Sequence, residues 1–600
     1  MADNLTLRRK LILGLTVAVF AVVAVFGGLE LVLRVVGFGH STRFFRQEKD
    51  AAGRTWWREN RWVTAPYFPP ELIRRPQSIR LADPKPANTY RVFVLGSSAA
   101  MGDPEPAFSL SRQLELQLRH AYPGIHFEVA NAGITAINSP VVRVLARDCA
   151  RLQPDLLIVY EGNNEVIGPY GPGTVFSQFL GSASAIRAGQ MIKSTRTGQL
   201  LASLARRVGP TNKDLGDWGG MRMFLKNEID RDDPRLVKTR ELFRDNMRDI
   251  AESGRRVGAA VFVCTVLTNQ KDFAPFVSRH RAGLTAAEKT KWQALFDEGQ
   301  QSVDAGDDAI AEKKFREALA LDEHFAELHF RLGRLCLRQN RAVEAKAFFQ
   351  QALDLDELRF RTDSRLNQVI RELAADGVKV VDLAAAAERQ SAQGIIGDEF
   401  LYEHVHLNFS GTYLMARELF TQVSVDLVRR KLIPGNAAPS EFISMQDARR
   451  QLAYTTYEQA MIIKELQARF AGAPFTAQSD NVARQRIYAE RASVATRMLA
   501  QLETRDGLVA LYEQALAASP GDWLLERNAG MALVGLGLPE RARPYLVHAA
   551  SVIPDDADTL FALATAQQKL GAAAASMETF TALRELEPRY PGLPSLPGKK

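Results

Sequence analysis

The sequence predicts an α/β domain with a parallel sheet, combined with all-helical repeats and preceded by one long apolar helix. Three observations lead to this prediction: short apolar runs alternate with helical patterns, a 34-residue period recurs in two places, and an uncharged stretch lies near the amino terminus. Six hundred residues are also too many for one hydrophobic core, so we expect several domains.

The uncharged stretch comprises residues 11–29 and follows Arg8, Arg9 and Lys10. As a helix it would rise about 28 Å, enough to cross the hydrocarbon core of a bilayer. It is long for a cleaved signal peptide, and no clear cleavage site follows it. We therefore expect residues 1–37 to be a single-pass anchor in the inner (plasma) membrane. The basic flank should stay in the cytoplasm, which leaves the bulk of the chain on the extracytoplasmic side, the periplasm of a bacterium.

Five short apolar runs predict the strands of the sheet. They are residues 90–95, 127–130, 155–160, 259–266 and 378–383. Helical patterns lie between them, for example at residues 108–120 and 141–152, and such crossover connections produce a parallel sheet covered on both faces. Residues 38–88 precede the first strand and are irregular and rich in aromatic residues, so we interpret them as a linker region. A mostly helical insertion at residues 167–255 is a candidate lid.

A 34-residue period marks two further parts of the chain. Prolines recur with this period at the carboxyl end, within residues 501–592, and the same period appears within residues 285–357. The repeated pairs of the first array are Gly299 and Gly333, Ala311 and Ala345, Phe315 and Phe349, and Ala318 and Ala352. This pattern resembles the tetratricopeptide repeat. The resemblance implies concave grooves that bind protein partners, and residues 431–500 would then be a helical connector.

The candidate chemistry begins where the first strand ends, at the segment GSSAAMG that contains Ser98. A serine on a tight turn between a strand and a helix exposes its hydroxyl at the carboxyl edge of the sheet. Helix amides there point at any negative charge that develops. Gly133 and Asn164 follow the second and third strands, so we expect them at the same edge.

A histidine far downstream supplies a candidate base. The segment EHVH contains Glu403, His404 and His406 and precedes a helical pattern. A carboxylate three residues before a histidine can accept a hydrogen bond from Nδ1, which leaves Nε2 free to take the serine proton. Asp398 is an alternative partner for His406, and we interpret His404 as a polar edge residue.

These four segments resemble the SGNH/GDSL family of serine hydrolases, which is defined by blocks that carry Ser, Gly, Asn and His. GSSAAMG resembles the first block, NAG the second, GNNE the third and EHVH the last, in the order of the family. The resemblance covers about residues 88–270 and 360–425. It implies a flavodoxin-like, three-layer fold for residues 89–430, into which the repeats at 285–357 are inserted.

The resemblance also implies roles for individual residues. Ser98 would be the nucleophile and His406 the general base, oriented by Glu403. The oxyanion hole would consist of the Ser98 amide, the Gly133 amide and the Asn164 side chain. The sequence departs from the family at three positions where the family has Asp, namely Ser97, Glu165 and Glu403.

The implied chemistry is acyl transfer through an acyl-enzyme, and three functions stay open. They are hydrolysis of an O-acyl ester of a glycan or lipid, transfer of the acyl group to an envelope glycan, and an inactive scaffold for protein partners. No metal-ligand pattern or phosphate-binding glycine motif occurs, and three separated cysteines suit buried thiols, so we expect no cofactor and no metal. A net charge of +7 without a basic stripe argues against nucleic acid.

Overall fold

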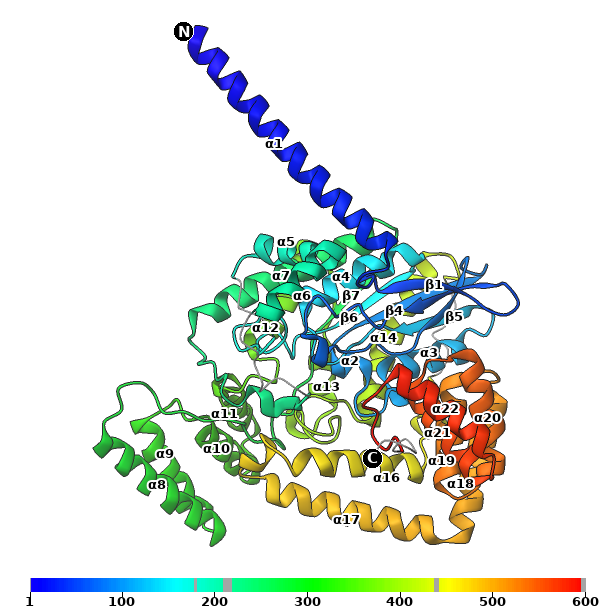
Figure 1. Cartoon of the computed structure of the whole chain (residues 1–600). Coiled ribbons are helices and arrows are strands. Elements are labelled where there is room, and N and C mark those ends of the chain that lie inside the picture. The colour runs from blue at the N-terminus through cyan, green and yellow to red at the C-terminus, as the bar shows by residue number, and fades with distance from the viewer. Residues whose placement is uncertain (1, 177–180, 209–217, 436–441, 595–600) are drawn as a thin grey trace.

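A five-stranded parallel sheet lies at the centre of the computed structural model, which describes residues 2–176, 181–208, 218–435 and 442–594 (Figure 1). The strand order is β5-β4-β6-β7-β8, and all neighbouring strands run parallel. The strands are β4 (Thr89–Gly96), β5 (His126–Asn131), β6 (Leu156–Tyr160), β7 (Ala260–Cys264) and β8 (Lys379–Val381). The predicted α/β class with a parallel sheet is confirmed.

Helices cover both faces of this sheet, which explains why its strands are almost continuously apolar. Val92, Phe93 and Leu95 of β4, for example, are completely buried. The helices of this domain include α3 (Leu110–Ala121), α4 (Ser139–Cys149), α7 (Pro234–Arg255), α12 (Ser364–Glu372), α13 (Leu383–Gln390) and α14 (Phe409–Arg429). Figure 1 shows α4 and α7 on one side of the sheet and α3 and α14 on the other.

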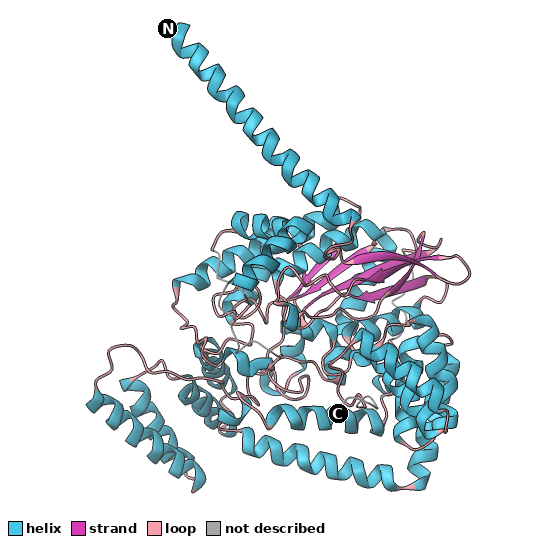
Figure 2. Ribbon diagram, viewed as in Figure 1, coloured by secondary structure: helices cyan, strands magenta, loops and turns pink. Residues whose placement is uncertain are grey.

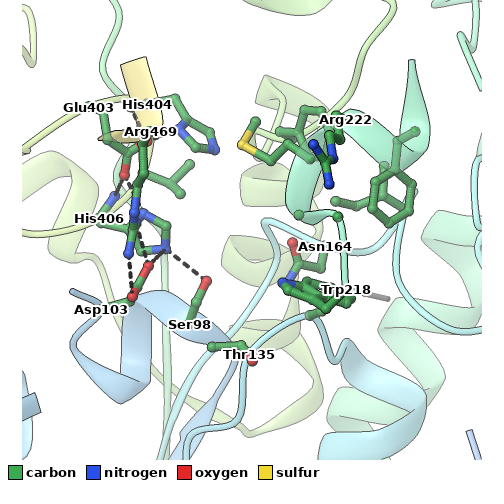
Figure 3. Close-up of a pocket in the computed structure, with 18 of the residues that line it drawn as sticks. Ser98, Asp103, Thr135, Asn164, Trp218, Arg222, Glu403, His404, His406 and Arg469 are labelled. Atoms are coloured by element: carbon green, nitrogen blue, oxygen red, sulfur yellow. Dashed lines mark hydrogen bonds and ion pairs between the residues drawn. The ribbon is translucent and has the colours of Figure 1, made fainter. Parts of the chain in front are cut away.

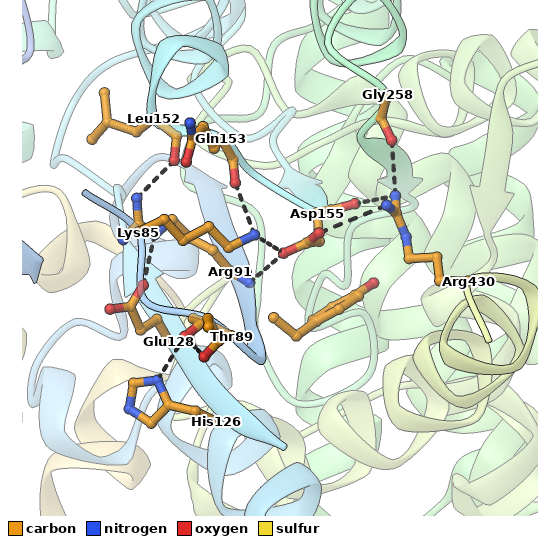
Figure 4. Close-up of polar contacts among 12 residues, drawn as sticks. Lys85, Thr89, Arg91, His126, Glu128, Leu152, Gln153, Asp155, Gly258 and Arg430 are labelled. Atoms are coloured by element: carbon orange, nitrogen blue, oxygen red, sulfur yellow. Dashed lines mark hydrogen bonds and ion pairs between the residues drawn. The ribbon is translucent and has the colours of Figure 1, made fainter. Parts of the chain in front are cut away.

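A polar network fastens the amino-terminal ends of the strands (Figure 4). Arg91 is buried and donates hydrogen bonds to Glu128 Oε2 at 2.6 Å and to the Leu152 carbonyl at 2.8 Å. Asp155 accepts from the Arg91 amide at 2.7 Å, and Arg430 of α14 donates to the Asp155 carbonyl at 2.7 Å. Each of these buried charged groups has hydrogen-bond partners, so the network stabilises the amino-terminal edge of the sheet. The candidate site is expected at the opposite, carboxyl edge.

The amino-terminal helix α1 (Ala2–Val35) points away from the rest of the molecule (Figure 1). Several of its apolar side chains are exposed, including Leu13, Phe20 and Val25. None of the helices in the described part of the chain has both the length and the apolarity of a membrane span. The span expected over residues 11–29 is therefore without support there.

Part of the segment expected to be an irregular linker folds into a small antiparallel sheet. It contains β1 (Phe45–Lys49), β2 (Thr55–Glu59) and β3 (Arg80–Asp83), in that order. The sequence of β1, FRQEK, is mostly polar and shows no regular alternation, so hydrophobic periodicity could not reveal it. Phe44 and Phe45 nevertheless pack into the main core.

The first repeat array consists of paired helices. It contains α8 (Ala286–Asp304), α9 (Asp308–Leu321), α10 (Ala326–Arg338) and α11 (Ala342–Leu355). At Gly299 a Cβ atom would lie 2.5 Å from the ring of Phe315, so the helices touch where that glycine faces the aromatic ring. Gly333 faces Phe349 in the same way one repeat later, which accounts for the 34-residue period.

From residue 409 onward, all regular secondary structure in the described residues is helical (Figure 2). The segment between the sheet domain and the second array holds α15 (Met445–Gln451), α16 (Thr456–Phe470) and α17 (Asn481–Ala500). The second array contains α18 (Leu502–Ala518), α19 (Trp523–Gly535), α20 (Pro539–Val552), α21 (Ala557–Lys569) and α22 (Ala573–Leu586). The insertion expected at residues 167–255 holds α5 (Ala183–Ser194), α6 (Arg196–Val208) and α7, while residues 177–180 and 209–217 of it lie outside the described residues.

Candidate active site

Ser98 is the first residue of the short helix α2 (Ser98–Met101), which Ser97 alone separates from the end of β4. The turn between them depends on Gly96, whose φ is +155° and whose added Cβ would lie only 2.1 Å from the Tyr160 carbonyl oxygen. Only glycine fits such a close approach of β4 to β6. The Ser98 hydroxyl is therefore held at the carboxyl edge of the sheet, as the sequence predicts.

His406 and Glu403 meet Ser98 at this edge (Figure 3). The Ser98 Oγ and His406 Nε2 atoms are 2.9 Å apart, and Nδ1 of the same ring contacts Glu403 Oε1. The Glu403 carboxylate also accepts the His404 amide at 2.7 Å and the His406 amide at 3.0 Å. A tight turn in which the Tyr402 amide donates to the His406 carbonyl at 2.8 Å brings these residues together.

The His406 ring is neutral at ordinary pH. Burial lowers the pKa of His406 to about 4, because a cationic ring would lose its hydration; the Asp103 carboxylate opposes this shift and the Arg469 guanidinium adds to it. A neutral ring whose Nδ1 faces a carboxylate has Nε2 free to accept a proton. His404 is also buried, beside Phe273 and other aromatic rings, and burial holds its pKa well below the usual range.

Asp103 and Arg469 complete the surroundings of His406, and the sequence gives no indication of either role. Asp103 Oδ2 lies 3.3 Å from His406 Nε2, and Arg469 binds the same carboxylate through both amino groups, at 2.6 and 2.8 Å. For Asp103, the separation of five residues from Ser98 is a sequence signal of proximity but not of a role. Arg469 comes from α16, and no local pattern connects it with the site.

The expected oxyanion donors are only partly in position. The Ser98 amide makes no hydrogen bond within the described residues. Asn164 lines the cavity and donates one side-chain N–H to the Ile137 carbonyl at 3.0 Å, while its second N–H has no acceptor among the described residues. The Gly133 amide instead donates to Asn131 Oδ1 at 3.0 Å. The position of Gly133 therefore does not support the expected role.

Ala136 is a better candidate for the third donor. The chain after Gly133 stays bound to the sheet, because the Ile134 amide donates to the Gly96 carbonyl at 3.1 Å. In the loop that joins β5 to α4, Thr135 and Ala136 are the residues that line the cavity. Ala136 has a left-handed φ of +61°, rare for a residue with a Cβ, and its amide finds no acceptor among the described residues. Such local strain is common at functional sites.

The cavity above Ser98 has a volume of about 620 Å³. Its walls combine the sheet edge with the insertion, which contributes Phe176, Trp218 and Arg222, and with Arg469 of α16. The insertion thus contributes part of the cavity wall.

Two other acidic candidates have structural roles. Asp398, the alternative partner of His406, accepts a hydrogen bond from Asn269 at 2.7 Å instead. Glu165 accepts both the amide and the hydroxyl of Ser139 at 2.7 Å, which caps the start of α4, and burial raises the pKa of Glu165 to about 7.

The described residues contain no cluster of side chains suited to a metal ion, and Cys149, Cys264 and Cys336 are buried free thiols.

Comparison with known proteins finds two kinds of match. A family model described as a tetratricopeptide repeat matches residues 326–358. No curated protein matches the chain. Among solved structures, the acetyl xylan esterase AlAXEase is 11% identical, covers 56% of this chain and 99% of its own, with a TM-score of 0.25. A GDSL-like lipase from Bacteroides thetaiotaomicron is 11% identical over 57% of this chain and 89% of its own, with a TM-score of 0.23.

The repeat protein YrrB, whose structure has an unusual peptide-binding site, is 12% identical over 52% of this chain and 94% of its own, with a TM-score of 0.15. The family model thus matches the segment that contains α10 and α11 of the first repeat array.

Proposed function

We propose that this protein is a serine hydrolase that cleaves an O-acyl ester of a glycan or lipid through an acyl-enzyme. The observation that carries the proposal is the continuous contact from Ser98 Oγ through the His406 ring to the Glu403 carboxylate, with 2.9 Å between the hydroxyl and Nε2. A nucleophile within hydrogen-bond reach of a base that a third group orients is the arrangement required for covalent catalysis. An inactive scaffold would have no need of this geometry.

The mechanism follows from these contacts. His406 Nε2 takes the Ser98 proton while Oγ bonds to the acyl carbon, and the carbonyl electrons move to its oxygen. The Ser98 and Ala136 amides and the free Asn164 N–H stabilise this oxyanion. The intermediate collapses with loss of the alcohol, which takes the proton from His406. Water then attacks the acyl-enzyme, with His406 again as base, and releases the acid and free Ser98.

Asp103 would stabilise the charged form of His406 during this cycle. Its carboxylate lies 3.3 Å from Nε2, close enough to attract the imidazolium that forms when Ser98 loses its proton. The fork of Arg469 holds the carboxylate in place.

The test is hydrolysis of p-nitrophenyl acetate by the whole protein and by Ser98→Ala. We expect Ser98→Ala to lose at least about a thousandfold in kcat, as loss of a nucleophile does elsewhere. Ser410→Ala, a serine just beyond His406, is the matched control and should keep its rate within a few-fold. Retention of activity by Ser98→Ala, or no labelling of Ser98 by a fluorophosphonate, would refute the proposal.

Transfer of the acyl group to an envelope glycan would use the same residues, so the acceptor decides between the two reactions. Added oligosaccharide that diverts the acyl group from water at the expense of free acid would identify an acyltransferase. Acid as the sole product in its presence would identify a hydrolase.

We also propose that α1 attaches the protein to the inner membrane, with the bulk of the chain on the periplasmic side, and that the repeats bind protein partners. The exposed apolar side chains of α1 and its direction away from the body support the attachment (Figure 1). Full-length protein should remain with membranes after an alkaline wash, whereas a chain without residues 2–35 should be released. Equal release of both chains would contradict the attachment.

A further inference from the structure

Two arginines in the active-site cavity have no acidic partner among the described residues. Arg74 donates from Nε to Thr135 Oγ1 at 2.7 Å, and its guanidinium lies 4.2 Å from the ring centre of Trp218. Its two terminal amino groups make no hydrogen bond in the described part of the chain. Arg222, on the short 3-10 helix η5 (Gly220–Phe224), is exposed, and its side chain likewise forms neither an ion pair nor a hydrogen bond there.

The acidic side chains that line the cavity, by contrast, are all engaged within the described residues. Asp103 binds Arg469 with both oxygens, and Glu465 binds the same guanidinium at 3.2 Å. Glu403 holds the two histidines. Figure 3 shows Arg222 and Trp218 across the cavity from Asp103 and His406. The carboxylates thus lie on the His406 side of the cavity, and the two arginines without a described acidic partner line the rest of its wall.

The buried position of the Arg74 guanidinium disfavours its positive charge, and an anionic ligand would stabilise that charge. Burial lowers the pKa of Arg74 to about 10, and the more distant charges of Asp103 and Glu587 only partly offset this. A guanidinium that has lost hydration without gaining a carboxylate is stabilised when an anion enters beside it. Its planar fork matches the oxygens of a carboxylate or phosphate.

We propose that the substrate carries an anionic group, a carboxylate or a phosphate, which binds Arg74 and Arg222 while its acyl ester lies over Ser98. This inference rests on the proposed ester chemistry and adds the class of substrate to it. The flat ring of Trp218, stacked on Phe176 with their centres 6.1 Å apart, would form the surface beside the bound anion.

The experiment compares three acetyl esters that differ in one group. They are 4-acetoxybenzoate, 4-acetoxyphenyl phosphate and the neutral 4-acetoxybenzamide, each normalised to its own rate of hydrolysis by hydroxide. We expect kcat/KM of at least one charged ester to exceed that of the amide about tenfold or more. The better of the two charged esters tells whether the natural anion is a carboxylate or a phosphate.

Variants then assign the preference to the arginines. Arg74→Gln and Arg222→Gln should each reduce the ratio of charged to neutral kcat/KM about tenfold, mainly through KM. Lys226→Gln, an exposed cation four residues beyond Arg222 and outside the cavity wall, should keep the wild-type ratio. A wild-type ratio near one, or variants that leave the ratio unchanged, would overturn the inference while Ser98-dependent hydrolysis still stood.

A binding measurement keeps the inference testable even without turnover. If no ester is hydrolysed through Ser98, the proposed function fails, and calorimetry on Ser98→Ala then decides the anion site alone. We expect 4-hydroxybenzoate or 4-hydroxyphenyl phosphate to bind at least tenfold more tightly than 4-hydroxybenzamide. Equal affinities would refute the site.

Discussion

His406 lies between two groups that influence its charge in opposite directions. The carboxylate of Asp103 favours the imidazolium, whereas burial and the nearby guanidinium of Arg469 disfavour it. Burial dominates, so the pKa of His406 is about 4 and the ring is a base even in mildly acidic solution. The balance also means that removal of either neighbour should change the pH at which the base is lost.

The acid limb of kcat/KM should therefore have its midpoint near pH 4, because the neutral ring is the reactive form and protonation below its pKa removes the base. Asp103→Asn removes a charge that raises this pKa, so the midpoint should move to lower pH. Arg469→Gln removes a charge that lowers it, so the midpoint should move to higher pH. Rates measured with a neutral ester between about pH 3 and 8 check this, and shifts of the same sign in both variants would contradict it.

Asn164 should act on the rate rather than on substrate binding, because the oxyanion that we propose it stabilises exists only in the transition state and the tetrahedral intermediate. Asn164→Ala should lower kcat by about 100-fold or more, roughly 3 kcal/mol, with KM changed much less. Asn227→Ala is the matched control, since Asn227 also donates to backbone carbonyls, at 3.0 Å, but lies outside the cavity wall. Loss of the same size in the control, or a loss confined to KM, would count against the oxyanion role.

At the scale of single elements, burial on both faces made the parallel strands predictable. β6, for example, consists of LLIVY and is buried throughout, so its apolar run alone identified it. β1 was not predicted, because its sequence is mostly polar. The serine, histidine and glutamate of the site were predictable from local spacing, whereas Ala136 was not, since a left-handed alanine has no sequence signature. Arg469 was missed because its contact with Asp103 joins segments far apart in the chain.

The junction of β4 with α2 should tolerate no side chain at position 96. Gly96→Ala would place a Cβ 2.1 Å from the Tyr160 carbonyl and 2.7 Å from Ala100 Cβ, at a φ of +155°. The clash should destabilise the sheet domain by about 3 kcal/mol or move β4 away from β6. Gly124→Ala is the control, because nothing lies within 4 Å of its added Cβ. A thermal midpoint of Gly96→Ala equal to that of the control would show that the junction accommodates a side chain at position 96.

At the scale of the whole molecule, the carboxyl-terminal helices reach the active-site loop directly. Asp103 binds Arg469 of α16, Glu105 binds Arg527 of α19 at 3.1 Å, and Arg112 pairs with Asp522, which caps α19. These contacts all fall within the eleven residues that follow α2. The second repeat array is thus connected by ion pairs to the segment that holds Asp103 beside His406.

The pair of Arg112 and Asp522 offers the most direct measure of this connection, because both side chains are largely buried, with exposed fractions of 17% and 10%. Asp522→Asn keeps a good helix cap but removes the charge, and Arg112→Met keeps the apolar stem. Each should destabilise the protein by about 3 kcal/mol, because one buried charge then loses its main partner.

The double variant should cost about 1 to 3 kcal/mol less than the sum of the single variants, since no charge is left alone. Unfolding of the full chain by denaturant gives all four stabilities, and kcat/KM of the same proteins tests whether the array also supports catalysis. Strictly additive losses would mean that this ion pair does not couple the repeats to the sheet domain. Coupled losses accompanied by reduced kcat/KM would mean that docking of the array sets the position of Asp103, and through it the basicity of His406.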